Sequence, residues 1–158
     1  MATKYDDASW HYEGDYPTDL PSDNGATHIG MFLAWCIQNG LASEELIADA
    51  ATEIQQVKDG KLSGAEFLIK VCDEKLTEYE LNELGQAFAG DYYEDDTDFS
   101  SRYGSYMDDY IDTFDEKADA LGFEYETLYH IENTPENYEL IKPVIDERFA
   151  AWKAYKAG

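Results

Sequence analysis

The stretch at residues 25–40, GATHIGMFLAWCIQNG, decides the fold of this chain. Its apolar side chains recur at steps of three and four residues, which is the period of an α-helix. These side chains belong to Ile29, Phe32, Leu33, Cys36 and Ile37. Gly40 follows them at the place where glycine commonly ends a helix. The stretch therefore predicts a helix over roughly 25–39 with one strongly apolar face.

Three further helices are predicted before residue 93. Ser43 precedes two glutamates that suit the positive end of a helix, and an apolar stripe runs from there to Gly60. Residues 63–66 and 77–80 have the Ser/Thr-x-x-Glu spacing of a capping box, in which each of the two side chains accepts a hydrogen bond from a free backbone N–H near the other. We therefore expect a third helix after the first box and a fourth after the second, ending at residue 90 or 93.

A fifth helix is predicted from aromatic spacing. Five aromatic side chains follow one another at steps of four, three, four and four: Phe99, Tyr103, Tyr106, Tyr110 and Phe114. This spacing places them on one helical face, and most aspartates of the same segment fall on another. The helix should end near Gly122.

The ends of the chain are less regular. Residues 1–25 mix acidic, aromatic and turn-forming residues, which predicts an irregular arm packed on the helices. Residues 123–131, FEYETLYHI, fit one short strand or hairpin and equally a loop that packs its aromatic side chains, so both interpretations stay open.

A last helix should begin at Pro135, because proline at the first helical position gives up an N–H that would be unpaired anyway, and Pro143 is where this helix would kink. The prediction is a mainly α fold, with residues 1–158 forming a single compact domain of five to six helices.

The composition is strongly acidic. Thirty-five Asp and Glu stand against 11 Lys and Arg, so the formal net charge is −24. Apolar residues make up 44% of the chain, which is enough for a sizeable core, so the charge is expected on a folded surface. Such a surface repels nucleic-acid phosphates and anionic lipid headgroups. We therefore expect no direct nucleic-acid partner, no membrane partner, and a cationic protein as the complementary partner.

The cysteines and the first residues indicate the compartment. Cys36 and Cys72 lie in apolar, helix-like stretches without CxxC spacing, so they are predicted to be core thiols. The opening residues lack the basic and apolar regions of a secretory signal, and no apolar run is long enough for a membrane span. A cytoplasmic location is expected.

The acidic residues are densest at residues 91–126, where thirteen Asp and Glu stand against Arg102 and Lys117. On a helix, acids three and four residues apart lie roughly 5–6 Å from one another along one face, close to the spacing of phosphates along a nucleic-acid strand. We therefore expect a partner-binding surface in which exposed tyrosines provide anchoring area. Its predicted residues are Asp91, Tyr92, Tyr93, Glu94, Asp95, Asp96, Asp98, Asp108, Asp109, Asp112, Asp115 and Asp119. The alternative is that these charges only keep an aromatic-rich helix soluble.

A second candidate site is a pocket between the arm and the first helix, lined by Trp10, His11, His28 and Trp35. The arm can bring the two histidines together, but a zinc site needs a third ligand, and the sequence singles out none of its many carboxylates. Motifs for nucleophilic catalysis and for phosphate binding are absent from the sequence. We therefore expect no catalytic residue, no metal and no cofactor. A small enzyme or ligand-binding domain built on this pocket is the alternative.

The opening KYDDASWHY, followed by GATHIGMFLAW, resembles a group of short, acidic, uncharacterised bacterial proteins that begin with a Trp-His arm and a GATHIGxFLxW helix. The resemblance covers roughly residues 4–40 and, more loosely, the later stretch EYETLYHIENTPENY. It implies a bacterial, cytoplasmic setting and no particular activity. In composition alone, the chain also resembles immunity proteins, which are small, acidic, single-domain inhibitors of bacterial toxins.

These observations lead to one main functional hypothesis. The chain is expected to be a cytoplasmic protein that inhibits a cationic protein partner, for example a nuclease toxin, by covering its basic site with the anionic helix. A structural or assembly subunit is a further hypothesis that the sequence leaves open.

Overall fold

The computed structural model describes residues 3–158, and most of these residues are helical. The mainly α fold predicted from the sequence is therefore confirmed. In chain order the elements are β1 (Lys4–Asp7), α1 (Ala8–Tyr12), the 3-10 helix η1 (Ser22–Ala26), α2 (Thr27–Gln38), α3 (Glu44–Asp49), α4 (Ala51–Lys58), α5 (Gly64–Val71), β2 (Lys75–Thr77), the 3-10 helix η2 (Glu78–Glu80), α6 (Glu83–Tyr92), α7 (Asp98–Tyr103), α8 (Tyr106–Leu121), the 3-10 helix η3 (Leu128–His130) and α9 (Pro135–Ala157). None of the helices in this part of the chain combines the length and apolar composition that crossing a bilayer would need.

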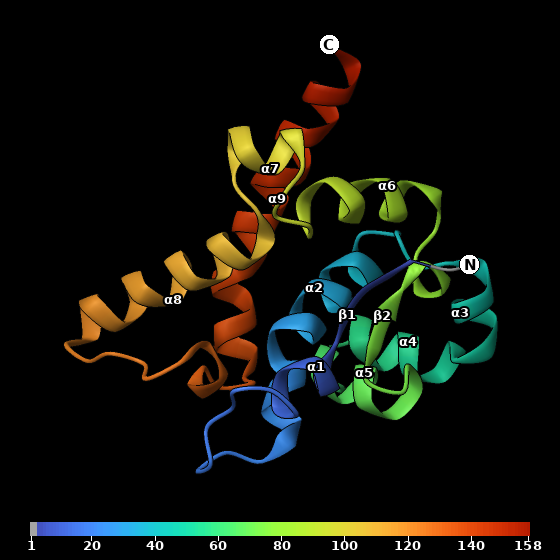
Figure 1. Ribbon diagram of the computed structural model, residues 1–158. Helices are drawn as coiled ribbons and strands as arrows, with labels where there is room; N and C mark the ends of the chain where they lie inside the picture. The colour runs from blue at the N-terminus through green and yellow to red at the C-terminus, as the bar shows by residue number, and fades with distance from the viewer. Residues whose placement is uncertain (1–2) are drawn as a thin grey trace.

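The core is built around α2. Residues 27–37 of this helix are all buried, so its neighbours cover every side and not just one apolar face. The helices α4, α5 and α9 pack against it (Figure 1). At the crossing with α5 the two backbones touch: a Cβ on Gly64 would stand 1.8 Å from the carbonyl oxygen of Gly30. Only glycine fits at this crossing. Cys36 and Cys72 are both buried, as predicted.

The N-terminal arm is more ordered than the sequence suggested. Strand β1 pairs antiparallel with β2, with Lys4 opposite Thr77 and Asp7 opposite Lys75 (Figure 1). The arm then continues into the short helix α1. The strand considered at residues 123–131 is not formed; this segment is a loop that contains η3. The strand pattern was missed at β1 because KYDD has no apolar alternation. Residues 1 and 2 of the predicted arm lie outside the described residues.

Two predicted helices are each divided in two. The second helix breaks at Ala50, whose backbone is non-helical (φ −135°, ψ 40°), and becomes α3 and α4. The fifth breaks at Gly104, whose φ of +116° favours glycine, and becomes α7 and α8. Aromatic spacing continues across this break, so the periodicity alone did not reveal it.

The capping signals were mostly interpreted correctly. Ser63 and Glu66 form the predicted capping box at the start of α5. The box at residues 77–80 also forms, but it caps the 3-10 turn η2, and the side chain of Asn82 caps α6. Helix α9 begins at Pro135 as predicted and continues past Pro143 to Ala157.

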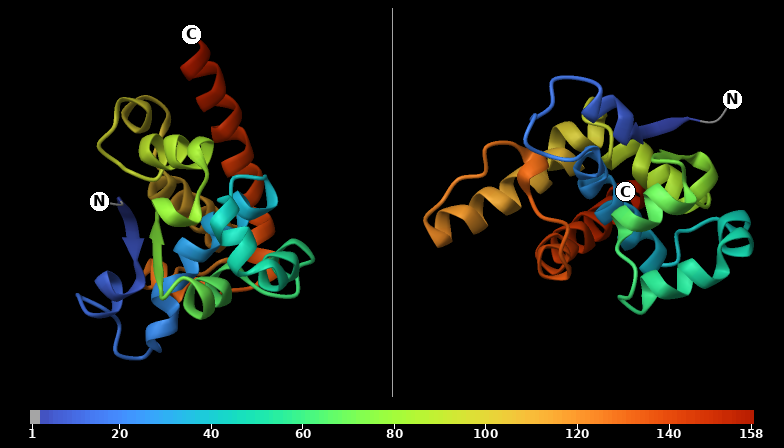
Figure 2. Two further views of the ribbon diagram at one scale, coloured as in Figure 1. Left: turned by 90° about the vertical axis from the view of Figure 1, so that its right-hand side faces the viewer. Right: turned by 90° about the horizontal axis from the view of Figure 1, so that it is seen from below.

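The last two helices leave the rest of the fold in different directions. Helix α9 packs against α2, α7 and α8 along its course. Helix α8 bonds to α9 near its start, through Asp109 and Arg148, and again through Lys117, whose Nζ donates to Oδ1 of Asn137 at 2.6 Å; its far end points away from the small sheet (Figures 1 and 2). One side of the second half of α8 is buried through Phe114 and Ala118, and the opposite side, which carries its aspartates, is exposed.

Candidate functional site

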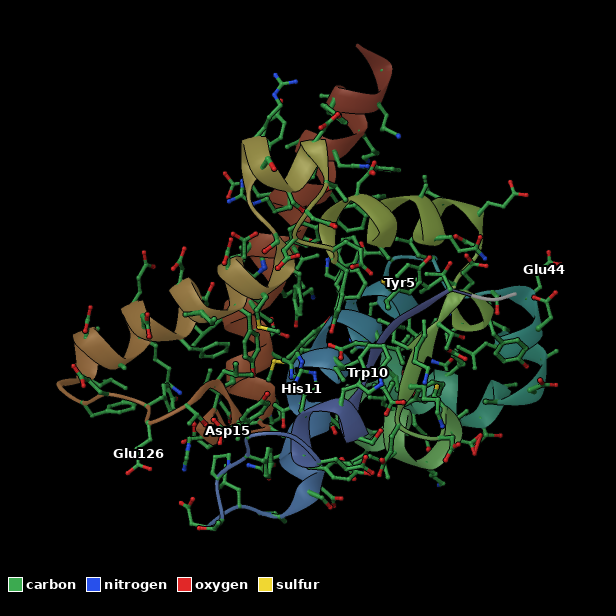
Figure 3. The ribbon with its side chains drawn as sticks, viewed as in Figure 1. Tyr5, Trp10, His11, Asp15, Glu44 and Glu126 are labelled. Atoms are coloured by element: carbon green, nitrogen blue, oxygen red, sulfur yellow. The ribbon has the colours of Figure 1, made fainter. Side chains whose placement is uncertain are left out.

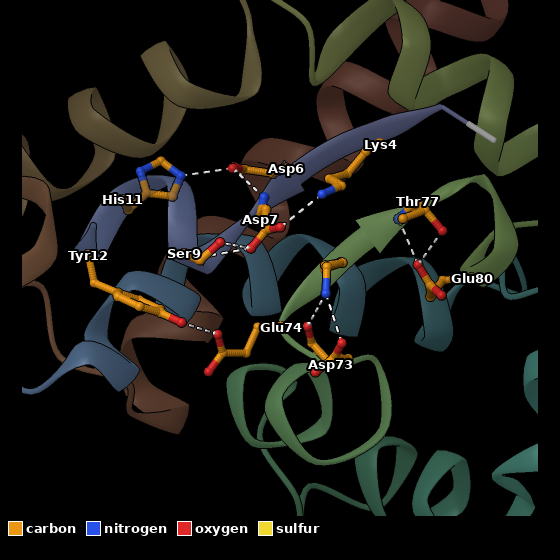
Figure 4. A network of polar contacts seen from close by, with 11 residues as sticks. Lys4, Asp6, Asp7, Ser9, His11, Tyr12, Asp73, Glu74, Thr77 and Glu80 are labelled. Atoms are coloured by element: carbon orange, nitrogen blue, oxygen red, sulfur yellow. Dashed lines mark hydrogen bonds and ion pairs between the residues drawn. The ribbon is translucent and has the colours of Figure 1, made fainter. Parts of the chain in front are cut away.

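An aspartate and two histidines meet where the N-terminal arm joins α2. Oδ1 of Asp6 lies 2.8 Å from Nε2 of His11, and Oδ2 of Asp6 lies 3.2 Å from Nε2 of His28. The two imidazole rings are edge to face, with their centroids 4.5 Å apart. We call Asp6, His11 and His28 the Asp–His centre; Figure 4 shows its Asp6–His11 contact.

Three elements of the N-terminal part of the chain place these side chains. Asp6 is on β1, which is held by its pairing with β2. His11 is on α1, whose first turn is capped by Asp7, because Oδ1 of Asp7 accepts the backbone N–H of Ser9 at 2.9 Å (Figure 4). His28 is in the first turn of α2. The centre therefore depends on the folding of the whole arm and not on one local motif.

Two tyrosines from distant parts of the chain complete the hydrogen bonding. The hydroxyl of Tyr93 donates to Oδ2 of Asp6 at 2.5 Å, and the hydroxyl of Tyr129 lies 2.7 Å from Nδ1 of His11. Tyr93 follows α6, and Tyr129 is in η3. The centre thus links the arm to α2, to the end of α6 and to the loop before α9.

Burial and hydrogen bonding set the charges in this centre. Asp6 is only 6% exposed, and this desolvation acts to raise its pKa; the hydrogen bonds from His11 and His28 outweigh it and hold the pKa below the usual 3.8. Burial lowers the pKa of His28, against the opposing effect of Asp6. An ionised carboxylate therefore lies beside a buried imidazole that resists protonation.

Two buried polar atoms next to the centre are unsatisfied. Nδ1 of His28 and the hydroxyl of Tyr110 have no hydrogen-bond partner among the described residues. Their rings lie 6.0 Å apart, centroid to centroid. Buried polar atoms are rarely left unpaired, so this side of His28 is incompletely satisfied by the protein alone.

The pocket predicted around the histidines is formed only in part. His11 and His28 do come together, as the sequence suggested, but the two tryptophans do not join them. Trp10 (Figure 3) is 56% exposed. Its ring lies 5.1 Å from Nζ of Lys4. Trp35 is fully buried and donates its indole N–H to Oδ1 of Asp146 at 2.7 Å. One tryptophan faces solvent and the other is a core residue, so the four side chains do not line one pocket.

The predicted acidic surface is present on α8. Asp108, Asp112, Asp115 and Asp119 are exposed at steps of four, three and four residues, so they share one helical face. None of them forms an ion pair with another residue in the described part of the chain. We call these four residues the acidic face of α8.

Three residues predicted for this surface are buried. Asp109 is 6% exposed and binds Arg148 and Tyr92, so it holds α8 to its neighbours. Tyr92 and Tyr93 are 0% and 9% exposed, and they cannot anchor a partner. Both were expected at the surface because they precede an acidic run, but α6 continues to Tyr92 and turns both rings into the aromatic core around Phe32.

The acidic run before α7 divides into two groups. Asp95, Asp96 and Asp98 are exposed, and Glu94 is half-buried. Asp91 is already hydrogen-bonded within the fold, because its Oδ2 accepts the indole N–H of Trp152 at 2.9 Å. The run therefore offers fewer free carboxylates than its sequence suggests.

Sequence reasoning missed the roles of Asp6, Tyr93 and Tyr129. The sequence gives no signal for Asp6 beyond its place before the Trp-His pair, because it is one of 35 similar acids. Sequence reasoning also missed a hollow of about 310 Å³ whose lining includes Met31, Leu62, Ser63 and Tyr138. None of the predicted site residues lines this hollow.

Comparison with known proteins identifies one family. A family model described as "Domain of unknown function (DUF7832)" matches residues 4–127, which contain the Asp–His centre and the acidic face of α8. No curated protein and no solved structure is similar enough to the chain to count as a match.

Proposed function

The chain belongs to the DUF7832 family, and we propose that it is a cytoplasmic protein that binds a cationic protein partner and inhibits it, as an immunity protein neutralises a bacterial toxin. The observation that carries this proposal is the acidic face of α8, whose four carboxylates are exposed and form no ion pair among the described residues. The proposal concerns occlusion of a basic site and requires no chemistry in this chain.

The acidic face supports the proposal because it is unfavourable without a partner. Carboxylates three and four residues apart on one helix repel one another, at a cost of a few tenths of a kcal/mol for each pair. A basic cleft facing them would remove this repulsion and be drawn in by long-range attraction. The effect should be seen mainly in the association rate and in its salt dependence.

The end of α8 supplies apolar contact area beside these charges. Leu121 is 66% exposed and Phe123 is 40% exposed; they lie two and four residues after Asp119, at the last residue of α8 and just beyond it. Apolar side chains next to a charged face are typical of interfaces in which a few buried anchors provide most of the binding energy. Leu121 and Phe123 take the anchoring role that the sequence analysis gave to Tyr92 and Tyr93.

The test compares charge reversals at two sites. Asp108, Asp112 and Asp115 are changed together to Lys, and in a control variant Glu44 and Glu45 are changed to Lys. Glu44 lies on the far side of the molecule from α8 (Figure 3). With a partner captured from the native bacterium and then purified, association rates are measured at low and high salt. We expect the α8 variant to associate more slowly and with a flatter salt dependence, and the control to behave like the wild type.

Inhibition has its own readout. If the partner is a toxin, co-expression of the wild-type chain should restore growth, and co-expression of the α8 variant should restore it less. Effects in proportion to the number of reversed residues, three in the α8 variant and two in the control, would mean that net charge alone matters, and an unchanged α8 variant would remove the acidic face from the interface.

A further inference from the structure

We propose that Asp6, His11 and His28 form a binding site for one divalent transition-metal ion of the zinc type. The sequence offered two histidines without a third ligand, and the fold supplies Asp6 as that ligand. This inference is independent of the acidic face of α8 and of the proposed inhibition.

The distances between the three groups are those of ligands around one ion. The candidate ligand atoms of Asp6, His11 and His28 all lie within 4.8 Å of one another, and the two carboxylate–imidazole distances are 2.8 and 3.2 Å. In a tetrahedral zinc site with bonds of about 2.0–2.1 Å, neighbouring ligand atoms are about 3.3 Å apart. The side chains therefore need only small shifts to surround an ion.

The donor set suits this class of metal. Two imidazole nitrogens and one carboxylate are a common ligand set for zinc and for neighbouring first-row metals, whereas Ca²⁺ and Mg²⁺ prefer oxygen ligands alone. Three protein ligands leave a fourth position for water or for a group from a partner. The site is therefore expected to discriminate against the alkaline-earth ions that the acidic surface attracts.

Metal ligands are usually held by outer hydrogen bonds, and two of these three ligands already have them. Oδ1 of Asp6 accepts the backbone N–H of Asp7 at 2.8 Å, and Oδ2 accepts the hydroxyl of Tyr93. Nδ1 of His11 meets the hydroxyl of Tyr129 at 2.7 Å. None of these contacts uses Nε2 of His11, so an ion could replace the Asp6–His11 hydrogen bond and leave the outer partners in place.

His28 is the one ligand of the three that has no outer hydrogen bond among the described residues. It is 1% exposed; its Nε2–H donates to the carboxylate of Asp6, and no described residue bonds to its Nδ1. A histidine kept only to satisfy Asp6 would leave this nitrogen buried and unpaired, which is unfavourable. Coordination through Nε2 would replace the 3.2 Å contact with Asp6 by a metal bond and leave the ring proton on Nδ1, the nitrogen that faces no carboxylate.

A second cluster provides a built-in control. Asp19, Glu126 and His130 also stand within 4.8 Å of one another, but both carboxylates are exposed. Exposed acids beside a histidine are common on an acidic surface without a bound ion. Replacing His130 removes one imidazole from the chain and leaves the Asp–His centre intact.

The experiment is a Zn²⁺ titration of the full chain, by calorimetry and by competition with a chelating dye, in excess Mg²⁺ to occupy surface carboxylates. We expect one Zn²⁺ per wild-type chain and an unchanged affinity in His130→Gln. His11→Gln should lose stoichiometric binding. Tyr129→Phe removes only the outer partner of His11, so it should fold normally and bind Zn²⁺ about 10-fold more weakly.

A spectroscopic readout separates a real site from surface binding. Co²⁺ held by nitrogen and oxygen ligands in a closed site should give visible absorption bands in the wild type and in His130→Gln, and these bands should be lost in His11→Gln. Circular dichroism checks that each variant is folded. Absence of a stoichiometric ion in the wild type would overturn the inference, and so would folded His11→Gln protein that binds Zn²⁺ as the wild type does.

Discussion

Asp109 of α8 and Arg148 of α9 form an ion pair through two hydrogen bonds, from Nε to Oδ2 at 2.8 Å and from Nη2 to Oδ1 at 3.0 Å. The hydroxyl of Tyr92 donates to the same carboxylate at 2.6 Å. The neighbouring Asp108 is exposed. Adjacent aspartates on α8 thus have opposite roles, one inside the fold and one on its surface.

Replacing Asp109 should therefore weaken the fold far more than replacing Asp108. In Asp109→Ala the guanidinium of Arg148 and the buried hydroxyl of Tyr92 lose their shared partner, and we expect the free energy of unfolding to fall by about 3 kcal/mol. Asp108→Ala should change it by less than about 1 kcal/mol. Urea unfolding followed by circular dichroism measures both. Similar losses in the two variants would show that the ion pair does not hold α8 to α9.

His28 should lower the stability of the fold as the pH falls from 7 to 5.5. The pKa of His28 is lowered below 6.5 in the fold, so under acid conditions the unfolded chain binds a proton that the folded chain does not. The free energy of unfolding therefore falls by up to about 1.4 kcal/mol for each pH unit below 6.5, until the pH reaches the pKa that His28 has in the folded chain. Asp6 adds a loss of the same sign only below pH 3.8, because its pKa is also lowered.

The contribution of His28 is isolated by comparison with His28→Gln. Acidification also relieves repulsion among the surface carboxylates, which acts in the opposite direction in both proteins. We expect the free energy of unfolding, measured by urea titration with a chelator present, to depend less on pH in His28→Gln than in the wild type. Parallel pH profiles would rule out His28 as the titrating group.

Replacing two helical glycines, one at a time, by alanine should change the stability of the fold in opposite directions. At Gly64 the new methyl group would overlap the carbonyl oxygen of Gly30, so α2 and α5 must separate, and we expect a loss of at least about 2 kcal/mol. At Gly90 in α6 nothing lies within 4 Å of the new Cβ, so Gly90→Ala should stabilise the fold by about 0.5–1 kcal/mol. Thermal unfolding of both variants tests the close approach of α2 and α5. An unchanged melting temperature in Gly64→Ala would contradict it.

Tryptophan fluorescence should report one exposed and two buried indoles. Trp10 is 56% exposed, whereas Trp35 and Trp152 are 0% and 3% exposed and donate to aspartates on other elements. Acrylamide is uncharged and is not repelled by the acidic surface. We expect it to quench mainly Trp10, so Trp10→Phe should remove most of the accessible fraction. Strong quenching that persists in this variant would mean that the core tryptophans are accessible.

Local signals in the sequence were enough for much of the fold. The capping box at residues 63–66 and the proline at residue 135 act on their own turns, so their helices were placed almost to the residue. The breaks at Ala50 and Gly104 were missed because apolar or aromatic spacing continues across each of them. The short strands were missed because β1 and β2 are about seventy residues apart and neither has a strand pattern of its own.

In the candidate sites, too, the sequence predicted what nearby residues decide and missed what distant contacts decide. His11 and His28 could be paired from the sequence, because the arm directly precedes the helix that carries His28. Asp6 could not be chosen, because its burial depends on the pairing of β1 with β2. Nor could the sequence separate Asp109 from Asp108, since only the position of Arg148 on α9 decides which of the two turns inward.

The contacts of Asp6 determine how the N-terminal arm can open. This one carboxylate bonds to His11, His28 and Tyr93, so it connects the arm to two helices at once. Releasing it would break those bonds together and expose the amides of β1 and β2 in the same event. Hydrogen exchange in the arm should therefore occur as a single cooperative unit, with one common opening free energy and not a gradient from residue 3 inward.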